Sequence, residues 1–236
     1  MSSGPNYYYT WNVARPPVAR VSTSRTELQQ IGIAYGVLTL DLVLIFGGVG
    51  LLYGGSTAYL VHHAVPLVLT AAAAALTGFV AHELAHKVVA QRRGFWAEFR
   101  MSPFGLLFSL FTAVMGFLWA APGATVVSGM SEVDLPNWGR TSLAGPAANA
   151  GFAAVFYAGS IGLLLARSPF YGWLLVLAFV NAWFGTFNLL PFGPLDGAKV
   201  LRWSRAVWVV AILGIGAFAA VAALALYVYG TPFLGW

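Results

Sequence analysis

Residues 64–89 read AVPLVLTAAAAALTGFVAHELAHKVV, and this stretch decides what kind of fold the chain can adopt. It is apolar over more than the roughly 20 residues that a helix needs to cross a bilayer. Its second half nevertheless carries His82, Glu83 and His86. Ionisable side chains inside a membrane helix are costly and usually serve a function. The stretch therefore predicts a membrane helix that carries chemistry.

The composition of the whole chain agrees with a membrane protein. Of its 236 residues, 59% are hydrophobic and 8% are charged, and the mean hydropathy is +0.78. A soluble domain carries about a quarter charged residues, so this chain cannot cover its own surface in water, and we expect lipid as a partner. The net charge of +5 is explained by membrane topology and predicts no nucleic-acid partner. Because the chain has no cysteine, thiolate metal ligands are excluded.

We expect an all-α, multi-pass membrane protein with about five transmembrane helices, because five segments have the length and apolar character that a crossing requires. These segments are residues 31–54, 64–89, 141–166, 171–190 and 206–230. A sixth apolar segment, residues 104–121, is barely long enough to cross and ends in Pro122 and Gly123.

The placement of basic residues decides whether residues 104–121 cross. If they do not, and the N-terminus is cytoplasmic, every Lys and Arg except Arg167 lies on the cytoplasmic side. If they do, four of these residues move outside: Arg140, Lys199, Arg202 and Arg205. The positive-inside rule favours the first arrangement. We therefore predict an integral membrane protein with a cytoplasmic N-terminus, a re-entrant or membrane-associated segment at 104–121, and an extended stretch at 124–128.

The pentapeptide at residues 82–86, HELAH, matches the pattern H-E-x-x-H. On a helix, residues four apart lie on one face, so the imidazoles of His82 and His86 can bind one zinc ion. Glu83 lies beside them, placed to take a proton from water at the metal rather than to bind the metal. The alternatives are a chance match or a polar helix end. The motif predicts one Zn²⁺ per chain.

A catalytic zinc needs three protein ligands and one open position. The remaining histidines, His62 and His63, fall on the opposite side of the membrane in the predicted topology. Among the acids we favour Asp196, which follows a Pro- and Gly-rich break at the cytoplasmic end of the fourth span. Irregular backbone at membrane depth is tolerated where protein or a water-filled cavity covers it. The alternative is that Asp196 caps the N-terminus of a following helix.

Three motifs, in this order, resemble those of the site-2 protease family of intramembrane metalloproteases. Residues 82–86 resemble its H-E-x-x-H, residues 142–149 (SLAGPAAN) its A-G-P-x-x-N helix, and residues 188–197 (NLLPFGPLDG) its N-x-x-P-x-x-x-L-D-G. The resemblance implies the following roles: His82, His86 and Asp196 hold zinc, Glu83 is the general base, and Asn188 contacts the substrate or the developing oxyanion. Asn149 is either a further site residue of this kind or part of a close helix contact.

The resemblance implies a zinc endopeptidase that cleaves transmembrane substrate proteins within the membrane, as in regulated intramembrane proteolysis. Two alternatives are a membrane metal transporter or channel, which gives no reason for Glu83 between two histidines, and an inactive scaffold, against which the intact Glu83 argues. We expect residues 1–28 to be a cytoplasmic tail and residues 29–230 one membrane domain, with its catalytic core at about 64–200. The role of Asp41, an acid inside the first span, stays open, as do the oligomeric state and the natural substrate.

Overall fold

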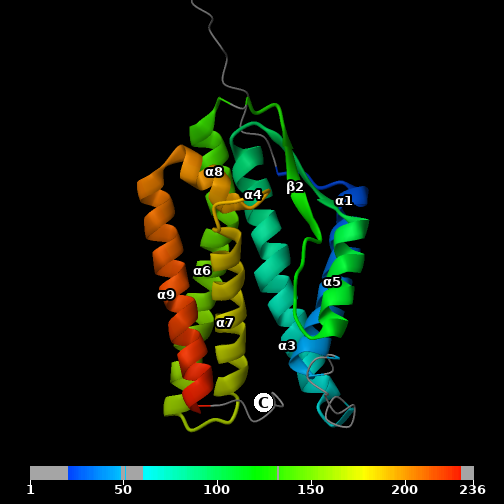
Figure 1. Cartoon of the computed structure of the whole chain (residues 1–236), viewed down its shortest axis with the longest axis vertical. Helices are drawn as coiled ribbons and strands as arrows, with labels where there is room; N and C mark the ends of the chain where they lie inside the picture. Colours follow the sequence, from blue (N-terminus) through cyan, green and yellow to red (C-terminus); the bar gives the residue numbers. More distant parts are fainter. Residues whose placement is uncertain (1–20, 49–50, 52–60, 132, 230–236) are drawn as a thin grey trace, which may run out of the picture.

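The computed structural model describes residues 21–48, 51, 61–131 and 133–229. These residues form an upright helix bundle with a two-stranded sheet near one end (Figure 1). The described elements, in chain order, are α1 (Arg25–Phe46), α3 (Ala64–Ala75), η1 (Leu76–Val80), α4 (Ala81–Arg92), β1 (Trp96–Met101), α5 (Pro103–Met115), β2 (Gly123–Ser128), α6 (Leu135–Leu165), α7 (Tyr171–Asn188), α8 (Asp196–Trp203) and α9 (Arg205–Tyr229). The predicted all-α class is confirmed.

Four of the described helices are long and apolar enough to cross a membrane. Three of them are α1, α6 and α9. The fourth is the continuous helix Ala64–Arg92, which consists of α3, η1 and α4. The fourth predicted span, residues 171–190, contains the helix α7, which packs against α6 and α9. It has 18 residues but is not among the four, because polar residues such as Asn181 and Asn188 lower its hydropathy. The helices have the character of a membrane protein.

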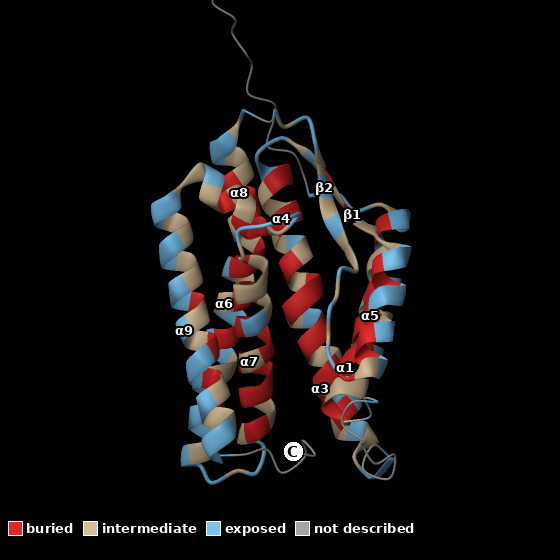
Figure 2. Cartoon of the chain, viewed as in Figure 1, coloured by how far each residue is buried: buried red, intermediate tan, exposed pale blue. Residues whose placement is uncertain are grey.

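The surface of the bundle is rich in exposed apolar side chains. In Figure 2 the outer faces of α9 and α5 are largely exposed, whereas the buried residues face the interior. Leu213 and Leu224 on α9, and Phe104 and Phe111 on α5, are all more than half exposed. Water-soluble monomers rarely expose apolar patches on this scale, so this surface suits contact with lipid.

The segment 104–121 leaves the sheet and returns to the same place. β1 pairs with β2 in an antiparallel register that ends at Met101 opposite Gly123, and the amide of Ser102 donates to the carbonyl of Pro122 at 2.8 Å. Between these points, the 13-residue helix α5 runs along α1, and the chain then leads back to β2 (Figure 1). The segment thus forms a hairpin that returns to the sheet, and β2 contains the extended stretch predicted at 124–128.

The start of α1 is tied to the rest of the fold by a buried ion pair. Ser24 caps the helix by accepting a hydrogen bond from the amide of Glu27, and the buried carboxylate of Glu27 pairs with Lys87 of α4. Its other oxygen accepts the amide of Phe99 in β1 at 3.0 Å. The predicted boundary between residues 28 and 29 falls inside α1, whose first turn is joined to α4 by this ion pair. Residues 1–20 of the predicted tail lie outside the described residues.

Candidate metal centre

The two histidines of the HELAH motif lie one turn apart on α4, directly after the π-helical turn η1. Both are buried, at 4% and 7% exposure. Their Nε2 atoms are 2.9 Å apart, so the rings converge on one point as the i, i+4 spacing predicts.

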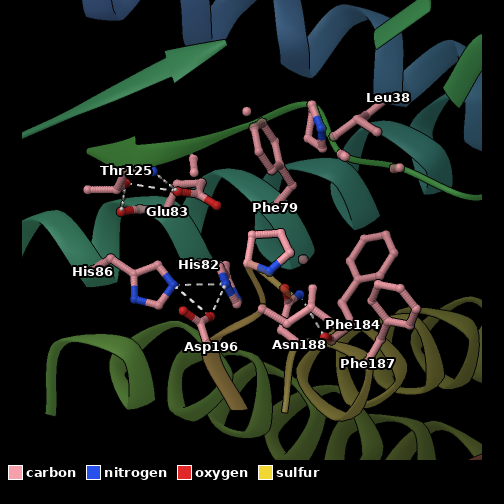
Figure 3. A pocket seen from close by; sticks show the side chains of 18 of the residues that line it. Leu38, Phe79, His82, Glu83, His86, Thr125, Phe184, Phe187, Asn188 and Asp196 are labelled. Atoms are coloured by element: carbon pink, nitrogen blue, oxygen red, sulfur yellow. Dashed lines mark hydrogen bonds and ion pairs between the residues drawn. The ribbon is translucent and has the colours of Figure 1, made fainter. Parts of the chain in front are cut away.

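Asp196 approaches the same point from another helix. It is the first residue of α8, and its Oδ2 lies 3.2 Å from Nε2 of His82 and 3.1 Å from Nε2 of His86 (Figure 3). Leu195, not Asp196, occupies the N-cap position, and no side chain there makes a capping bond. The carboxylate therefore faces the histidines, as the ligand prediction requires, and does not cap the helix.

The donor atoms fit a zinc ion. Nε2 of each histidine and Oδ2 of Asp196 form a triangle with edges of 2.9, 3.1 and 3.2 Å. Ligand atoms around tetrahedral zinc, at about 2.0 Å from the metal, are separated by about 3.3 Å. Two imidazoles with one carboxylate form a donor set that suits zinc. In the described part of the chain, these three residues form the cluster of His, Cys, Asp or Glu side chains whose ligand atoms lie close enough together to hold one metal ion.

Outer hydrogen bonds orient both rings for ligation. Nδ1 of His86 lies 2.7 Å from the carbonyl oxygen of Thr141, and Nδ1 of His82 lies 2.7 Å from Oδ1 of Asn149. Since both partners can only accept, each Nδ1 carries a hydrogen, so the neutral form of each ring has its lone pair on Nε2. Such outer partners fix the tautomer and the direction of metal-binding histidines.

The carboxylate of Asp196 is held in its charged form by its neighbours. Burial alone would raise its pKa, but the charge of His86 and the hydrogen bonds from both histidines, when these rings are protonated, outweigh that effect, so the pKa of Asp196 lies well below its usual range. Its second oxygen, Oδ1, lies 4.0 Å from Nζ of Lys199. A carboxylate that is ionised and directed at two imidazoles is suited to bind a cation.

Helix α6 packs against the ring nitrogens through a glycine. A Cβ placed on Gly145 would lie 2.4 Å from Nε2 of His86 and 2.5 Å from Nε2 of His82. No side chain larger than hydrogen fits there. The A-G-P-x-x-N-like segment thus contributes space through Gly145 and a hydrogen-bond partner for His82 through Asn149.

Glu83 faces the strand β2. Its Oε2 accepts hydrogen bonds from the amide and from Oγ1 of Thr125, both at 2.8 Å. Thr125 Oγ1 also lies 3.1 Å from the carbonyl oxygen of Glu83. Figure 3 shows Glu83 on the β2 side of α4, apart from the side chains of His82, His86 and Asp196. Among the described residues, both hydrogen bonds of the Glu83 carboxylate are made by Oε2, which leaves Oε1 available to water.

These side chains open onto a cavity of about 520 Å³. Much of its wall is apolar: Leu38 and Leu42 of α1, Phe79 of η1, Phe184 and Phe187 of α7, and Trp119 from the segment that returns to β2. The ring of Trp119 meets that of Phe187 edge to face, with centroids 6.0 Å apart. An apolar cavity with a few polar groups at one place is the usual form of a ligand site.

The two asparagines of the sequence prediction occupy different places. Asn188 lines the cavity at the end of α7, with its Nδ2 bonded to the carbonyl of Phe184 at 3.0 Å. Asn149 is fully buried and bonded to His82, so it lies behind the ring and not in the cavity lining. Asp41 is fully buried in α1, and neither carboxylate oxygen has a hydrogen-bond partner among the described residues.

Sequence reasoning missed three contacts of the site. Thr125 belongs to no recognisable motif, and its contact with Glu83 depends on the path of β2. Thr141 contributes its backbone carbonyl, which any residue type provides. Asn181, bonded to Asn149, did leave a signal, because it is a polar residue in the middle of an apolar run.

Two curated proteins are similar to the chain in sequence. "Putative zinc metalloprotease MJ0611" of Methanocaldococcus jannaschii is 36% identical over 141 residues, which make up 59% of this chain and 71% of that protein. "Putative zinc metalloprotease Rip3" of Mycobacterium tuberculosis is 36% identical over 137 residues, which make up 55% of this chain and 30% of Rip3. No family model and no solved structure matches the chain.

Proposed function

The chain belongs to the site-2 protease family of zinc metalloproteases, and from this premise we propose that it cleaves peptide bonds of transmembrane proteins within the membrane. One observation carries the proposal. An apolar helix long enough to cross a bilayer carries His82, Glu83 and His86. Asp196 comes from α8 and converges with the two histidines on one point. A hydrolytic site placed there, with apolar cavity walls, suits an apolar polypeptide that arrives from the membrane.

In this proposal, His82, His86 and Asp196 hold the zinc, one ion per chain. When bound, zinc supplies Lewis-acid chemistry, polarising a carbonyl oxygen and making water more acidic. Glu83 is the general base: its free Oε1 takes a proton from the attacking water, and the carboxyl then gives the proton to the leaving amine. Thr125 holds Oε2, so that the carboxylate keeps one direction while the proton moves.

Asn188 is placed to contact the substrate. It lies at the end of α7 beside the cavity, and its amide turns back onto its own helix through the bond to the Phe184 carbonyl. A rotation of the side chain exchanges this bond for one to a substrate carbonyl or to the developing oxyanion. The contacts of Asn149 favour a different role, the orientation of His82.

The strand β2 offers a docking edge for an unwound substrate. One edge of β2 pairs with β1, and the described sheet contains no strand on the other edge. Ala124, Thr125 and Val127 line the cavity, next to Glu83. A helical substrate hides its carbonyls in its own hydrogen bonds, so it has to unwind before attack, and strand addition to β2 replaces the bonds that unwinding breaks.

The arrangement of the helices favours a cytoplasmic N-terminus. The N-terminal ends of α1, α6 and α9 and the C-terminal ends of α4 and α7 lie at one end of the bundle, the upper end in Figure 1. Arg167 lies in the connection between α6 and α7, at the opposite end. By the positive-inside rule the upper end faces the cytoplasm. His82 precedes Arg92, the last residue of α4, by about 15 Å along the helix axis, so the site lies inside the membrane near that face.

The proposal is tested with the purified chain in lipid vesicles and a panel of single-span membrane proteins. Cleavage is expected, and it should stop on addition of a chelator and return with zinc. Glu83→Gln should keep the zinc and lower the cleavage rate by at least about a hundredfold, the usual effect of losing a general base. Substantial cleavage by that variant would refute the role of Glu83. Zinc flux into the vesicles without cleavage would instead indicate a transporter, and zinc binding with neither activity would indicate a scaffold.

A further inference from the structure

Asn181 lies in the middle of α7, fully buried, and makes polar contacts with two other elements. Its Nδ2 donates to Oγ1 of Thr77 in η1 and to the carbonyl of Leu177 in its own helix, each at 2.9 Å. Its Oδ1 accepts from Nδ2 of Asn149 on α6 at 3.3 Å. It does not line the cavity. A polar side chain at such depth is expensive unless its hydrogen bonds have a purpose.

The direction of each hydrogen bond follows from the chemistry of its partner. The hydroxyl of Thr77 donates its one hydrogen to the carbonyl of Ala73 at 2.8 Å, so it can only accept from Asn181. The Leu177 carbonyl is likewise an acceptor. The Nδ2 of Asn181 must therefore face Thr77 and Leu177, which turns its Oδ1 toward Asn149.

The same reasoning carries over to the histidine. Nδ2 of Asn149 lies 3.3 Å from Oδ1 of Asn181 and 2.9 Å from the carbonyl oxygen of Gly78, and both of these atoms accept. Oδ1 of Asn149 is then the atom that faces Nδ1 of His82, at 2.7 Å. An amide oxygen cannot donate, so Nδ1 of His82 carries a hydrogen, and in the neutral ring Nε2 has the lone pair that a metal needs.

We propose that Asn181 is a positioning residue of the metal centre, which fixes the tautomer and the direction of His82 through Asn149. This inference rests on the proposed role of His82 as a zinc ligand. Asn181 joins α7, which leads to Asp196, with the π-helical turn that precedes His82. It therefore ties α7 to both elements that hold His82 in place, the turn η1 and, through Asn149, the helix α6.

The proposal is tested by a double-mutant cycle on zinc affinity, measured by chelator competition on the purified chain. Asn149→Leu should weaken zinc binding by about 10- to 100-fold, the range for partners of metal ligands. Asn181→Leu should weaken it by several-fold, up to about tenfold. Because Asn181 acts through Asn149, the double variant should bind zinc as weakly as Asn149→Leu alone. Additive effects, or an unchanged affinity in Asn181→Leu, would overturn the proposal.

Two further variants separate a positioning role from a general loss of packing. Asn181→Asp keeps an acceptor toward Asn149 and, when protonated, a donor toward Thr77, so it should bind zinc within about twofold of the original chain. Thr186→Val changes a polar residue of the same helix whose hydroxyl bonds back to the Ala182 carbonyl, and it should leave the affinity unchanged. If Asn181→Asp binds zinc as poorly as Asn181→Leu, the proposal fails.

A spectroscopic measurement reports the tautomer without zinc or substrate. The chain has four histidines, so nitrogen resonances of the zinc-free, histidine-labelled protein can be assigned by substitution. His82 should carry its hydrogen on Nδ1, and Asn181→Leu should produce a mixture of tautomers. A single Nδ1–H form in Asn181→Leu would refute the inference. If the unmodified chain cleaved no membrane protein, but Asn181→Leu still produced a mixture of His82 tautomers, only the proposed function would be refuted.

Discussion

Gly145→Ala is expected to abolish zinc binding while leaving the helix that carries the substitution intact. The added Cβ would lie 2.4 Å from Nε2 of His86 and 2.5 Å from Nε2 of His82, where ordinary contacts begin at 3.4 Å. Each ring nitrogen would have to move by about 1 Å, whereas metal–ligand distances tolerate about 0.2 Å. The expected loss of zinc affinity is at least about a hundredfold, beyond the range for outer partners of a ligand.

The matched control lies on the same helix. A Cβ on Gly151 meets nothing within 4 Å, so Gly151→Ala should bind zinc normally and gain about 0.5–1 kcal/mol from the higher helix propensity of alanine. Both variants are purified in parallel, and zinc affinity is measured by chelator competition, with thermal unfolding as the test of folding. Equal zinc affinities for Gly145→Ala and Gly151→Ala would refute the placement of the ring nitrogens against α6.

Three other changes test separate parts of the structure. Thr125→Val removes one hydrogen bond to Glu83 and should lower the cleavage rate by about tenfold, with the zinc content unchanged. Thr125→Ser, which keeps the hydroxyl, should retain activity. An unaltered rate in Thr125→Val would contradict the orienting role of Thr125. Lys87→Met leaves the buried Glu27 without its partner and should cost about 3–5 kcal/mol in unfolding free energy. Adding Glu27→Leu should recover only part of this, because it removes the unpaired charge but also the acceptor of the Phe99 amide. A stability of Lys87→Met equal to that of the original chain would show that the pair is not buried as described. Arg167→Cys, in a chain that otherwise lacks cysteine, should react with an impermeant thiol reagent from outside the cell, and reaction from the cytoplasmic side alone would reverse the proposed topology.

The metal centre was predictable to the extent that helix geometry fixes it. His82 and His86 share a face because residues four apart always do. Asp196 was predictable because this acid follows a Pro- and Gly-rich break at the end of a predicted span, and the structure brings it to the histidines. The outer contacts were less accessible. Thr125 lies 42 residues from Glu83, and only the path of the chain through β1, α5 and β2 brings them together.

The hairpin at residues 104–121 shows where composition reaches its limit. These residues are apolar enough to suggest a span, and their marginal length and the distribution of basic residues around them argued against one. The structure gives the physical reason. α5 has 13 residues, fewer than a helix needs to cross a bilayer, and the pairing of β1 with β2 brings the chain back to the point where it left. Nothing in the sequence marked the π-helical turn before His82, because no residue pattern distinguishes such a turn from an ordinary one.

That π-helical turn sets the rotational phase of the metal-binding half of its span. The amide of Ala81 bonds to the carbonyl of Leu76, five residues back, so the turn holds one residue more than an α-helical turn. The five residues of this turn cover about the rotation that four residues cover in an α-helix, so the turn absorbs one residue without changing the direction of the side chains that follow. If the same residues, Leu76–Val80, formed an ordinary α-helix, every residue that follows would be rotated by about 100° relative to α3. The imidazoles would then point away from Gly145 and Asp196. A hydropathy profile would not register this change, yet it would disassemble the centre.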